Sequence, residues 1–344
     1  MTAPLSVAII GAGSIAGGFD ERRRPDDTGV YSHAGAYAAH GGFELKTVLD
    51  TDPGRAEAFQ RFWQVGRRAS SPEEVYGGFH DVISVCSPDS CHFDTVREIL
   101  TRRCCRTVFV EKPLAPGIGQ IEELIALAAM NGMKVVVNFQ RRNETGHREL
   151  RSAIASRPGE LLSVSCHYMK GLNHTGVTMI DTLCYLCGYP EAVLAYHRAL
   201  NEETGDYSYE FVLFYDGFTV GVKTTDAARF RYNYHLFEID LLFCDRRTAL
   251  VDISQGIRES PVTGYAYSGV KIMNERQARY RETGYKTSMV DAVAYLHDIT
   301  TGTTAHETNT PQSSYNNSII INRIIESFER GSVKLNMEHA LWKR

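Results

Sequence analysis

The chain has 344 residues, of which 43% are hydrophobic and 23% charged, and its formal net charge is −4 at pH 7. This length exceeds one ordinary core and predicts two domains, and the nearly balanced charge argues against a nucleic-acid-binding protein. No apolar run approaches the roughly 20 residues that cross a bilayer. The first run, Leu5 to Ile10, leads directly into a glycine-rich turn, so we interpret it as a strand and not as a signal peptide. We therefore expect a cytoplasmic protein that does not contact membranes.

Up to residue 140, short apolar runs alternate with helical patterns. The expected strands are Val7–Ile10, Leu45–Leu49, Val82–Cys86, Val108–Val110 and Val135–Asn138, and the expected helices are Arg55–Gln64, Ser90–Leu100 and Gly119–Asn131. Strands that alternate with helices form right-handed crossovers and a parallel sheet, which binds its ligand beyond the carboxyl ends of the strands. The sequence therefore predicts an α/β domain over residues 1–140.

A glycine-rich turn, Gly11-Ala12-Gly13-Ser14-Ile15-Ala16, closes the first expected strand. Gly11 permits the tight turn, Gly13 lets the backbone approach a pyrophosphate, and Ala16 stands where a third glycine is common. We expect Gly11, Gly13, Ser14 and Ile15 to bind a dinucleotide. The alternative is a glycine-rich turn that binds no ligand.

Asp50 ends the second expected strand, where a carboxylate can accept hydrogen bonds from the ribose hydroxyls of the cofactor. It would repel the 2′-phosphate of NADP(H), and no arginine follows immediately. The prediction is therefore NAD(H), with NADP(H) as the alternative. Asp52-Pro53 also has the pattern of a helix start, so Asp50 and Asp52 are expected to divide the two roles.

Two further motifs follow expected strands. Ser87-Pro88-Asp89 should lie beside the cofactor, with Pro88 fixing the turn. His92, in the next helix, is interpreted either as structural or as a cofactor contact. Glu111-Lys112-Pro113 places a lysine at the end of the fourth expected strand, and together with the glycine turn it indicates a nicotinamide-dependent oxidoreductase.

The pattern changes in the second half, residues 141–344, where strands follow one another at short spacing. The expected strands are Leu161–Met169, Ala192–Leu200, Tyr207–Tyr215, Phe218–Thr225, His235–Phe243 and Thr248–Ile253, followed by helices Ser288–Ile299 and Asn316–Arg330. Phe230, Tyr232, Tyr234 and Phe237 either stack on a sugar or pack within a strand. Cys184-x-x-Cys187 lies in an apolar helical pattern, so we expect buried thiols and no metal site.

These motifs resemble those of the Gfo/Idh/MocA family, named after glucose–fructose oxidoreductase and inositol dehydrogenase. The resemblance rests on the motifs above, on Asn138-Phe139-Gln140-Arg141-Arg142, and on Gly176-x4-Asp181 with the apolar residues that follow. It implies a doubly wound Rossmann domain followed by an α/β domain with a large, mostly antiparallel open sheet. The outer face of that sheet commonly builds dimers or tetramers, so a homodimer or homotetramer is expected. In several members the last stretch of chain packs back on the first domain.

The resemblance also implies residue roles. Lys112 would lie near the nicotinamide, where an ammonium polarises a carbonyl or stabilises an alkoxide, and the peptide before Pro113 is often cis in this family. The matched motifs add Glu111 and Gln140 to the cofactor site, and Arg141 to the substrate site.

The second-domain motif departs from the family pattern, in which an Asp and a His work with the lysine. Here His174 stands at the usual Asp position, Thr178 stands at the usual His position, and Asp181 is retained. Because threonine cannot titrate near neutral pH, His174 is the expected acid/base with Lys112 and Asp181. Asn173, Thr178, Tyr168 and Tyr234 are candidates for substrate contacts. The alternatives are that His174 caps the following helix, or that the site has lost catalysis.

Residues 17–31 are an insertion relative to the family pattern, polar and rich in glycine and proline. We expect a loop, interpreted as a partly mobile lid that brings Arg22–Arg24 near an anionic substrate group. The alternative is a solvated loop in which Asp26 and Asp27 balance the arginines.

The sequence thus predicts an NAD(H)-dependent sugar dehydrogenase or ketoreductase acting on a nucleotide-linked or modified sugar. A cyclitol is the next substrate class. The alternative function classes are a non-catalytic NAD(H)-binding regulatory protein and an enzyme that uses NAD without net redox change.

Overall fold

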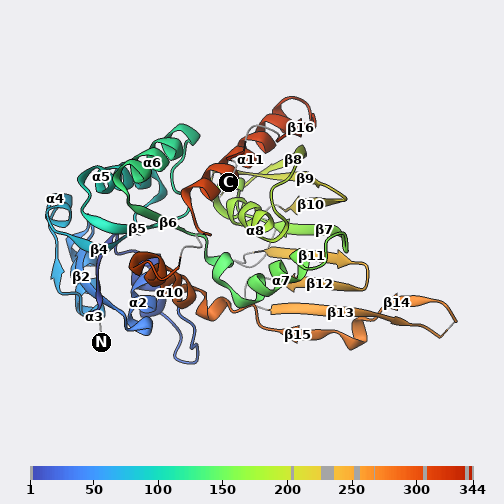
Figure 1. Ribbon diagram of the computed structural model, residues 1–344, viewed down its shortest axis with the longest axis horizontal. Helices are drawn as coiled ribbons and strands as arrows, with labels where there is room; N and C mark the ends of the chain where they lie inside the picture. Colours follow the sequence, from blue (N-terminus) through green and yellow to red (C-terminus); the bar gives the residue numbers. More distant parts are fainter. Residues whose placement is uncertain are drawn as a thin grey trace. The chain divides into compact units, whose positions relative to one another are not determined.

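The computed structural model describes residues 3–202, 205–225, 236–251, 256–266, 268–304, 308–337 and 341–342. The chain divides into two compact units, shown in Figure 1. Unit 1 comprises Met1–Asn143 and Lys286–Tyr315, and unit 2 comprises Glu144–Tyr285 and Asn316–Arg344. Each unit is built on its own sheet and hydrophobic core, so the α/β fold class expected from the sequence is confirmed.

Unit 1 contains a six-stranded parallel sheet in the order β3-β2-β1-β4-β5-β6. This is the strand order of the dinucleotide-binding doubly wound fold, in which the order reverses beside β1. The strands are β1 (Leu5–Ile10), β2 (Phe43–Leu49), β3 (Arg67–Arg68), β4 (His80–Val85), β5 (Cys105–Glu111) and β6 (Lys134–Asn138).

Helices cover both faces of this sheet because its central strands are apolar on both sides. Along β1, Val7 and Ile9 pack with one set of helices, and Ala8 and Ile10 pack with the other. The first set is α2 (His33–His40), α3 (Pro53–Trp63) and α10 (Ser288–Thr301), and the second is α5 (His92–Arg102) and α6 (Ile118–Asn131). Shorter helices are α1 (Phe19–Glu21) and α4 (Pro72–Tyr76).

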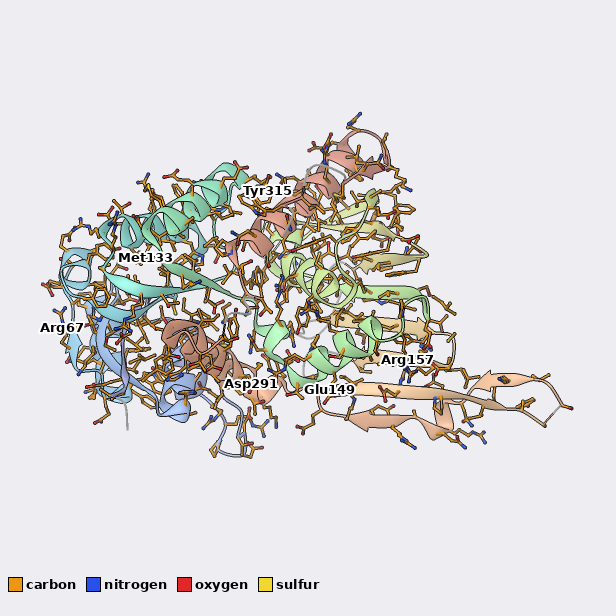
Figure 2. The ribbon with its side chains drawn as sticks, viewed as in Figure 1. Arg67, Met133, Glu149, Arg157, Asp291 and Tyr315 are labelled. Atoms are coloured by element: carbon orange, nitrogen blue, oxygen red, sulfur yellow. The ribbon has the colours of Figure 1, made fainter. Side chains whose placement is uncertain are left out.

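A late segment of the chain, Lys286–Tyr315, belongs to unit 1. Met289, Val293 and Leu296 of α10 are fully buried in the core that contains β1 and β5. Figure 2 labels Asp291 on α10 and Tyr315, the residue at which this segment ends. The division therefore differs from a single split after residue 140, because a helix far along the chain completes one face of the first sheet.

Unit 2 contains a ten-stranded sheet in the order β14-β13-β12-β11-β7-β10-β9-β8-β16, with β15 paired to β13. All its pairings are antiparallel except β10 with β7. The strands are β7 (Leu161–Tyr168), β8 (Ala192–Leu200), β9 (Tyr207–Tyr215), β10 (Phe218–Thr224), β11 (Phe237–Phe243), β12 (Arg246–Val251), β13 (Gly256–Gly264), β14 (Lys271–Met273), β15 (Arg279–Arg281) and β16 (Leu335–Asn336).

One face of this sheet packs against helices. The core joins alternate residues of the central strands, such as Val164 and Cys166 of β7, with Ile180 of α8 and Ile324 of α11. The helices of this part are α7 (Thr145–Ala155), α8 (Val177–Cys187) and α11 (Pro311–Glu329), the last of which crosses the unit boundary. On the other face, intervening residues such as His167 are exposed.

Several elements escaped the sequence prediction, among them the helices α2, α4 and α7 and the strands β3, β13, β14, β15 and β16. The expected helix Ser90–Leu100 begins later, at His92, because a 3₁₀ turn, Asp89–Cys91, precedes it. Phe230, Tyr232 and Tyr234 lie outside the described residues. None of the described helices combines the length and apolarity needed to cross a bilayer.

Candidate active site

The turn after β1 allows a ligand to approach closely. Gly11 has a φ of +91°, and a Cβ there would lie 2.7 Å from the backbone that follows β4, so only glycine fits. At Gly13 a Cβ would meet no heavy atom of the described residues within 4 Å. A π-helical turn, Ser14–Gly18, begins directly after it, with Ser14 exposed. Ile15 is partly buried against the core.

The carboxylate of Asp50, which follows β2, is already engaged with the backbone. Its Oδ2 accepts from the Ala12 amide at 2.7 Å and its Oδ1 accepts from the Asp52 amide at 2.8 Å. Arg55 Nη1 lies 3.5 Å from Oδ1, an arginine that the sequence analysis did not select. Asp52 caps α3, so the two aspartates have separate roles. Each carboxylate oxygen has two lone-pair sites, so Asp50 retains capacity for ribose hydroxyls.

His92 connects two loops at the carboxyl ends of β4 and β5. Its Nε2 lies 2.9 Å from the Ser87 carbonyl oxygen, and its Nδ1 lies 2.7 Å from the Pro113 carbonyl oxygen. The side chain is fully buried. This geometry favours the structural role of His92 over a direct cofactor contact. Beside it, Ser87 Oγ is buried and has no hydrogen-bond partner among the described residues.

Glu111 ends β5 within a buried polar chain. Its Oε1 accepts from His33 Nε2 at 2.8 Å and from Asn138 Nδ2 at 2.6 Å, and the His33 side chain is fully buried. Burial raises the pKa of Glu111, but the hydrogen bonds from His33 and Asn138 and the positive charge of Lys112 outweigh it. The pKa therefore lies below its ordinary value of 4.5, and the carboxylate is ionised.

The chain continues beyond His33 to a tyrosine. His33 Nδ1 lies 3.4 Å from Ser84 Oγ, which lies 2.6 Å from the Tyr37 hydroxyl. Burial raises the pKa of Tyr37 far above its ordinary value, so the phenol stays protonated. One order satisfies every donor: Tyr37 donates to Ser84, Ser84 donates to His33 Nδ1, and His33 Nε2 donates to Glu111. His33 was not identified from the sequence.

Lys112 directly follows Glu111, the last member of this hydrogen-bonded series of side chains. The Lys112–Pro113 peptide is cis. The segment after β6 that carries the family motif is largely enclosed by other parts of unit 1. Gln140 Nε2 donates to Ser288 Oγ of α10 at 2.7 Å, and Arg141 is 5% exposed. Unit 1 thus gathers Lys112 and the expected cofactor residues at the carboxyl ends of β1, β2, β4, β5 and β6.

The inserted segment 17–31 is held by its own charges. Arg23 lies 3.8 Å from Asp20, and Arg24 pairs with Asp26 at 3.0 Å. Asp27 accepts from the Gly29 amide at 2.8 Å. The alternative to the lid interpretation, in which Asp26 and Asp27 balance the arginines, describes Arg24, whereas Arg23 lies beside Asp20.

In unit 2, His174 lies in a π-helical turn, Leu172–Gly176, and its side chain is exposed. The preceding residues Lys170 and Gly171 both have positive φ, +70° and +91°. Asp206 holds the loop by accepting from the Asn173 amide at 2.6 Å and from Asn173 Nδ2 at 3.1 Å. The Asn173 side chain, expected to contact substrate, therefore already has a protein partner.

Helix α8 follows this turn, with Gly176 at its N-cap position, so His174 is not the capping residue. Thr178 is partly exposed in the first turn. Asp181 is 1% exposed, and its Oδ1 accepts from Asn317 Nδ2 of α11 at 2.7 Å. Its buried position favours an orienting role over direct contact with substrate.

Tyr168 was expected to contact a substrate hydroxyl, and the structure corrects this. The side chain is fully buried. Its hydroxyl donates to the Tyr209 carbonyl at 2.9 Å and accepts from the Tyr209 amide at 2.7 Å. Tyr168 therefore joins β7 to β9 within the core.

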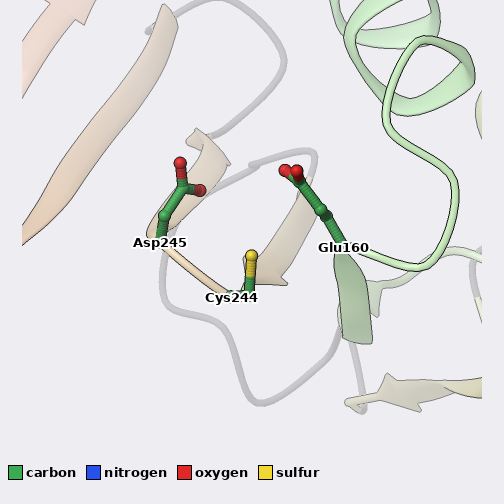
Figure 3. A group of neighbouring side chains, drawn as sticks. All are labelled: Glu160, Cys244 and Asp245. Carbon is green, nitrogen blue, oxygen red and sulfur yellow. The ribbon is translucent and has the colours of Figure 1, made fainter.

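The free cysteines and one acidic group are further candidate metal ligands. All eight cysteines are free thiols, and burial raises the pKa of Cys187 to about 12. Glu160, Cys244 and Asp245 bring their ligand atoms within 4.8 Å of one another, as Figure 3 shows. Arg157 Nη1 lies 3.5 Å from Glu160 and 3.4 Å from Asp245, so a guanidinium already balances both carboxylates. We assign no metal to this group.

The residues of unit 1 fit a dinucleotide. The position beside Gly13 is open, the approach at Gly11 excludes any side chain, and Ser87 Oγ is a buried group that lacks a partner among the described residues. Strand order, glycine turn and the lysine after β5 together define the class: an α/β protein with a dinucleotide-binding Rossmann domain.

Comparison with known proteins agrees with this class. Residues 5–139 match the oxidoreductase family with an NAD-binding Rossmann fold, Gfo/Idh/MocA. The resemblance drawn from the sequence motifs is therefore confirmed.

Individual relatives are more distant. The oxidoreductase YhhX of Escherichia coli K12 is 28% identical over 207 residues, covering 49% of this chain and 59% of its own. The D-glucoside 3-dehydrogenase of the same strain is 25% identical over 210 residues, covering 55% of this chain and 56% of its own. The matched part thus spans less than two thirds of either relative.

The fold extends over nearly the whole chain. The crystal structure of GenD2 from gentamicin A biosynthesis, in complex with NAD, has a TM-score of 0.75 at 17% identity. The superposition covers 98% of this chain and 97% of that one. At this identity the likeness shows the fold alone.

Proposed function

We propose that this protein is an NAD(H)-dependent oxidoreductase that transfers hydride between the nicotinamide and a sugar carbon carrying a secondary alcohol or ketone. One observation carries the proposal: the ligand-ready glycine turn after β1 and Lys112 after β5 belong to the same edge of one parallel sheet. A lysine at that edge can act on the oxygen of a carbon that exchanges hydride there.

Bound nicotinamide would supply or accept the hydride. The Lys112 ammonium would stabilise the developing alkoxide, and its own proton can move to or from the substrate oxygen. The position of Lys112 is set by Glu111 on one side and by the turn ending at Pro113 on the other. His174 is proposed as the second proton-transfer group and Asp181 as an orienting residue, with Arg141, Asn173, Thr178 and Tyr234 as substrate contacts.

A sugar is the substrate class that the relatives favour, because one of them is named a D-glucoside 3-dehydrogenase. We propose a nucleotide-linked or modified sugar, with a cyclitol as the next class. By the same reasoning the partner is a small molecule. The family resemblance separately suggests that the exposed outer face of the unit 2 sheet joins copies of the chain into a homodimer or homotetramer. Light scattering of the purified protein gives its mass, and a monomer at all concentrations would reject that assembly.

Thr178 favours a second candidate function. It replaces the histidine that the family uses as acid/base, so the protein could bind NAD(H) and regulate a partner without catalysis. An enzyme that uses NAD without net redox change remains a third class. Both predict bound cofactor whose redox state no sugar alters.

Substitution of Lys112 tests the proposal. We expect Lys112→Ala to lower kcat by about a hundred- to ten-thousand-fold, the usual contribution of a positioned proton-transfer group. Cofactor affinity should change little, because the glycine turn and Asp50 are untouched. Steady-state kinetics and NADH titration measure the two effects, and a Lys112→Ala variant that retains full turnover would remove the lysine from the mechanism.

A further inference from the structure

Arg22 differs from the two arginines that follow it. It forms no ion pair with any residue that the structure describes. Its Nη2 donates to Ser14 Oγ at 2.8 Å, and Ser14 is the residue that follows Gly13 in the ligand-ready turn. A Cβ at Gly18 would lie 3.0 Å from both terminal nitrogens of Arg22, so the guanidinium lies against the π-helical turn. The inserted segment thus places the positive charge of Arg22 beside the glycine turn that precedes the segment.

The backbone that carries Arg22 is anchored to α3. Glu21 Oε1 accepts from Trp63 Nε1 at 2.8 Å. The same indole closes over Gly17, where a Cβ would lie 2.3 Å from Trp63 Nε1. Trp63 therefore contacts Gly17, which precedes the short helix α1, and Glu21, the last residue of α1 and the one immediately before Arg22.

The far end of the insertion is also anchored. Asp20 accepts from the amides of Tyr31 and Ser32 at 3.0 Å each, and Ser32 is the N-cap of α2. The Val30 amide donates to the Lys286 carbonyl at 2.8 Å. The insertion is therefore attached to α2 and to the segment before α10, and Arg22 projects from a supported backbone.

We propose that Arg22 binds the diphosphate of the nicotinamide dinucleotide and serves this chain as an additional cofactor-binding residue. The inference rests on the proposed function, since it assigns a residue to the same cofactor site. A guanidinium beside the open position at Gly13 offers paired N–H donors to phosphate oxygens, and charge-assisted bonds of this kind are stronger than neutral ones. The hydrogen bond to Ser14 Oγ holds the guanidinium against the glycine turn.

A nucleotide-linked sugar also carries a diphosphate, so the source of the phosphate must be distinguished. The contact made by Arg22 is to Ser14, within the turn that matches the NAD-binding family. This favours the cofactor as the ligand. ADP-ribose tests this assignment, because it carries the cofactor diphosphate without nicotinamide, and its competition with NADH shows that it occupies the cofactor site.

The test uses the full-length protein and calorimetric titration with ADP-ribose and NADH. Arg22→Gln should weaken both by about tenfold, the usual worth of a hydrogen bond to a charged group. Arg22→Lys should recover part of the loss. Arg24→Gln is the matched control, because it removes the same charge from the same triplet at a side chain that is 82% exposed and paired with Asp26. It should bind like the unchanged protein.

Three results would overturn the inference. Equal affinities of Arg22→Gln and Arg24→Gln for ADP-ribose would show that Arg22 does not contact the diphosphate. A rise in the KM of a sugar nucleotide with unchanged ADP-ribose binding would assign the guanidinium to the substrate instead. If the unchanged protein bound neither ADP-ribose nor NADH, the proposed function would fail together with the inference, whereas the first two results leave that function intact.

Discussion

Asp50 combines a structural contact with a proposed selectivity role. One oxygen accepts from Ala12 in the glycine turn, so the carboxylate helps to shape the site, and Arg55 lies 3.5 Å from the other oxygen. The negative charge of Asp50 opposes a 2′-phosphate, and the positive charge of Arg55 favours one. We therefore expect cofactor preference to depend on a balance between these two neighbouring side chains.

Substitution of each partner should move this preference in opposite directions. Asp50→Asn keeps an acceptor for the Ala12 amide but removes the charge, so the affinity for NADPH relative to NADH should rise about five- to tenfold, roughly one pair of surface charges. Arg55→Gln should lower the same ratio. Titration with both reduced cofactors measures it, and an unchanged ratio in Asp50→Asn would mean that Asp50 does not select the cofactor.

Single residues also show what sequence reasoning could not supply. Motif positions such as Gly11 and Lys112 were identified because spacing and residue type specify them. The sequence did not reveal that Tyr168 and His92 point their polar atoms at backbone carbonyls, because those partners lie on other strands and loops. Arg22 was grouped with two neighbours that have the same charge, and only the contacts separate it from them.

At the scale of elements, a buried hydrogen bond to an ionised carboxylate fixes α2 to the parallel sheet. His33, the first residue of α2, meets Glu111 at the end of β5, and Asn138 of β6 joins them. Unpairing a buried charge is costly because the carboxylate is left without compensation in a medium of low dielectric. The pair should therefore support both stability and the backbone just before Lys112.

Replacement of His33 by leucine, which removes the donor to the Glu111 carboxylate, should lower the free energy of unfolding at neutral pH by about 2 kcal/mol, the usual cost of leaving a buried polar group without its hydrogen bond. The folded-state pKa of Glu111 is lowered below 4.5, so in the unchanged protein its contribution is present above that value and is lost as pH falls through the folded pKa. Without the His33 donor, fewer interactions oppose the effect of burial, so that pKa would rise.

The deficit of His33→Leu should consequently be smaller at a mildly acidic pH than at neutral pH, because a Glu111 carboxyl that has lost this donor takes up a proton more readily. Urea denaturation at the two pH values measures this change. Glu111→Gln is the control, because it keeps an acceptor for His33 without a titrating carboxyl. A deficit that is the same at both pH values would show that His33 does not stabilise an ionised Glu111.

For the whole molecule, local pattern predicted most of the parallel sheet and the central strands of the second sheet. It failed where the outcome depends on distant packing. An amphipathic pattern of helical period marked α10 as a helix, but nothing local indicates that it covers a face of the first sheet, where Met289 and Val293 are buried. The strand β13 contains charged residues and a proline, and β14 and β15 have three residues each, so their pairing partners define them more than their residues do.

The central claim is that hydride passes between bound nicotinamide and a sugar. The most direct measurement follows the absorbance of reduced nicotinamide in the purified protein while sugar nucleotides, keto-sugars, glucosides and cyclitols are added in turn, with Lys112→Ala in parallel. We predict that one sugar class changes the redox state of the cofactor, that the direction of the change gives the direction of the reaction, and that the variant responds far more slowly. Bound cofactor that no member of the panel oxidises or reduces would contradict this account and favour a regulatory or redox-neutral protein.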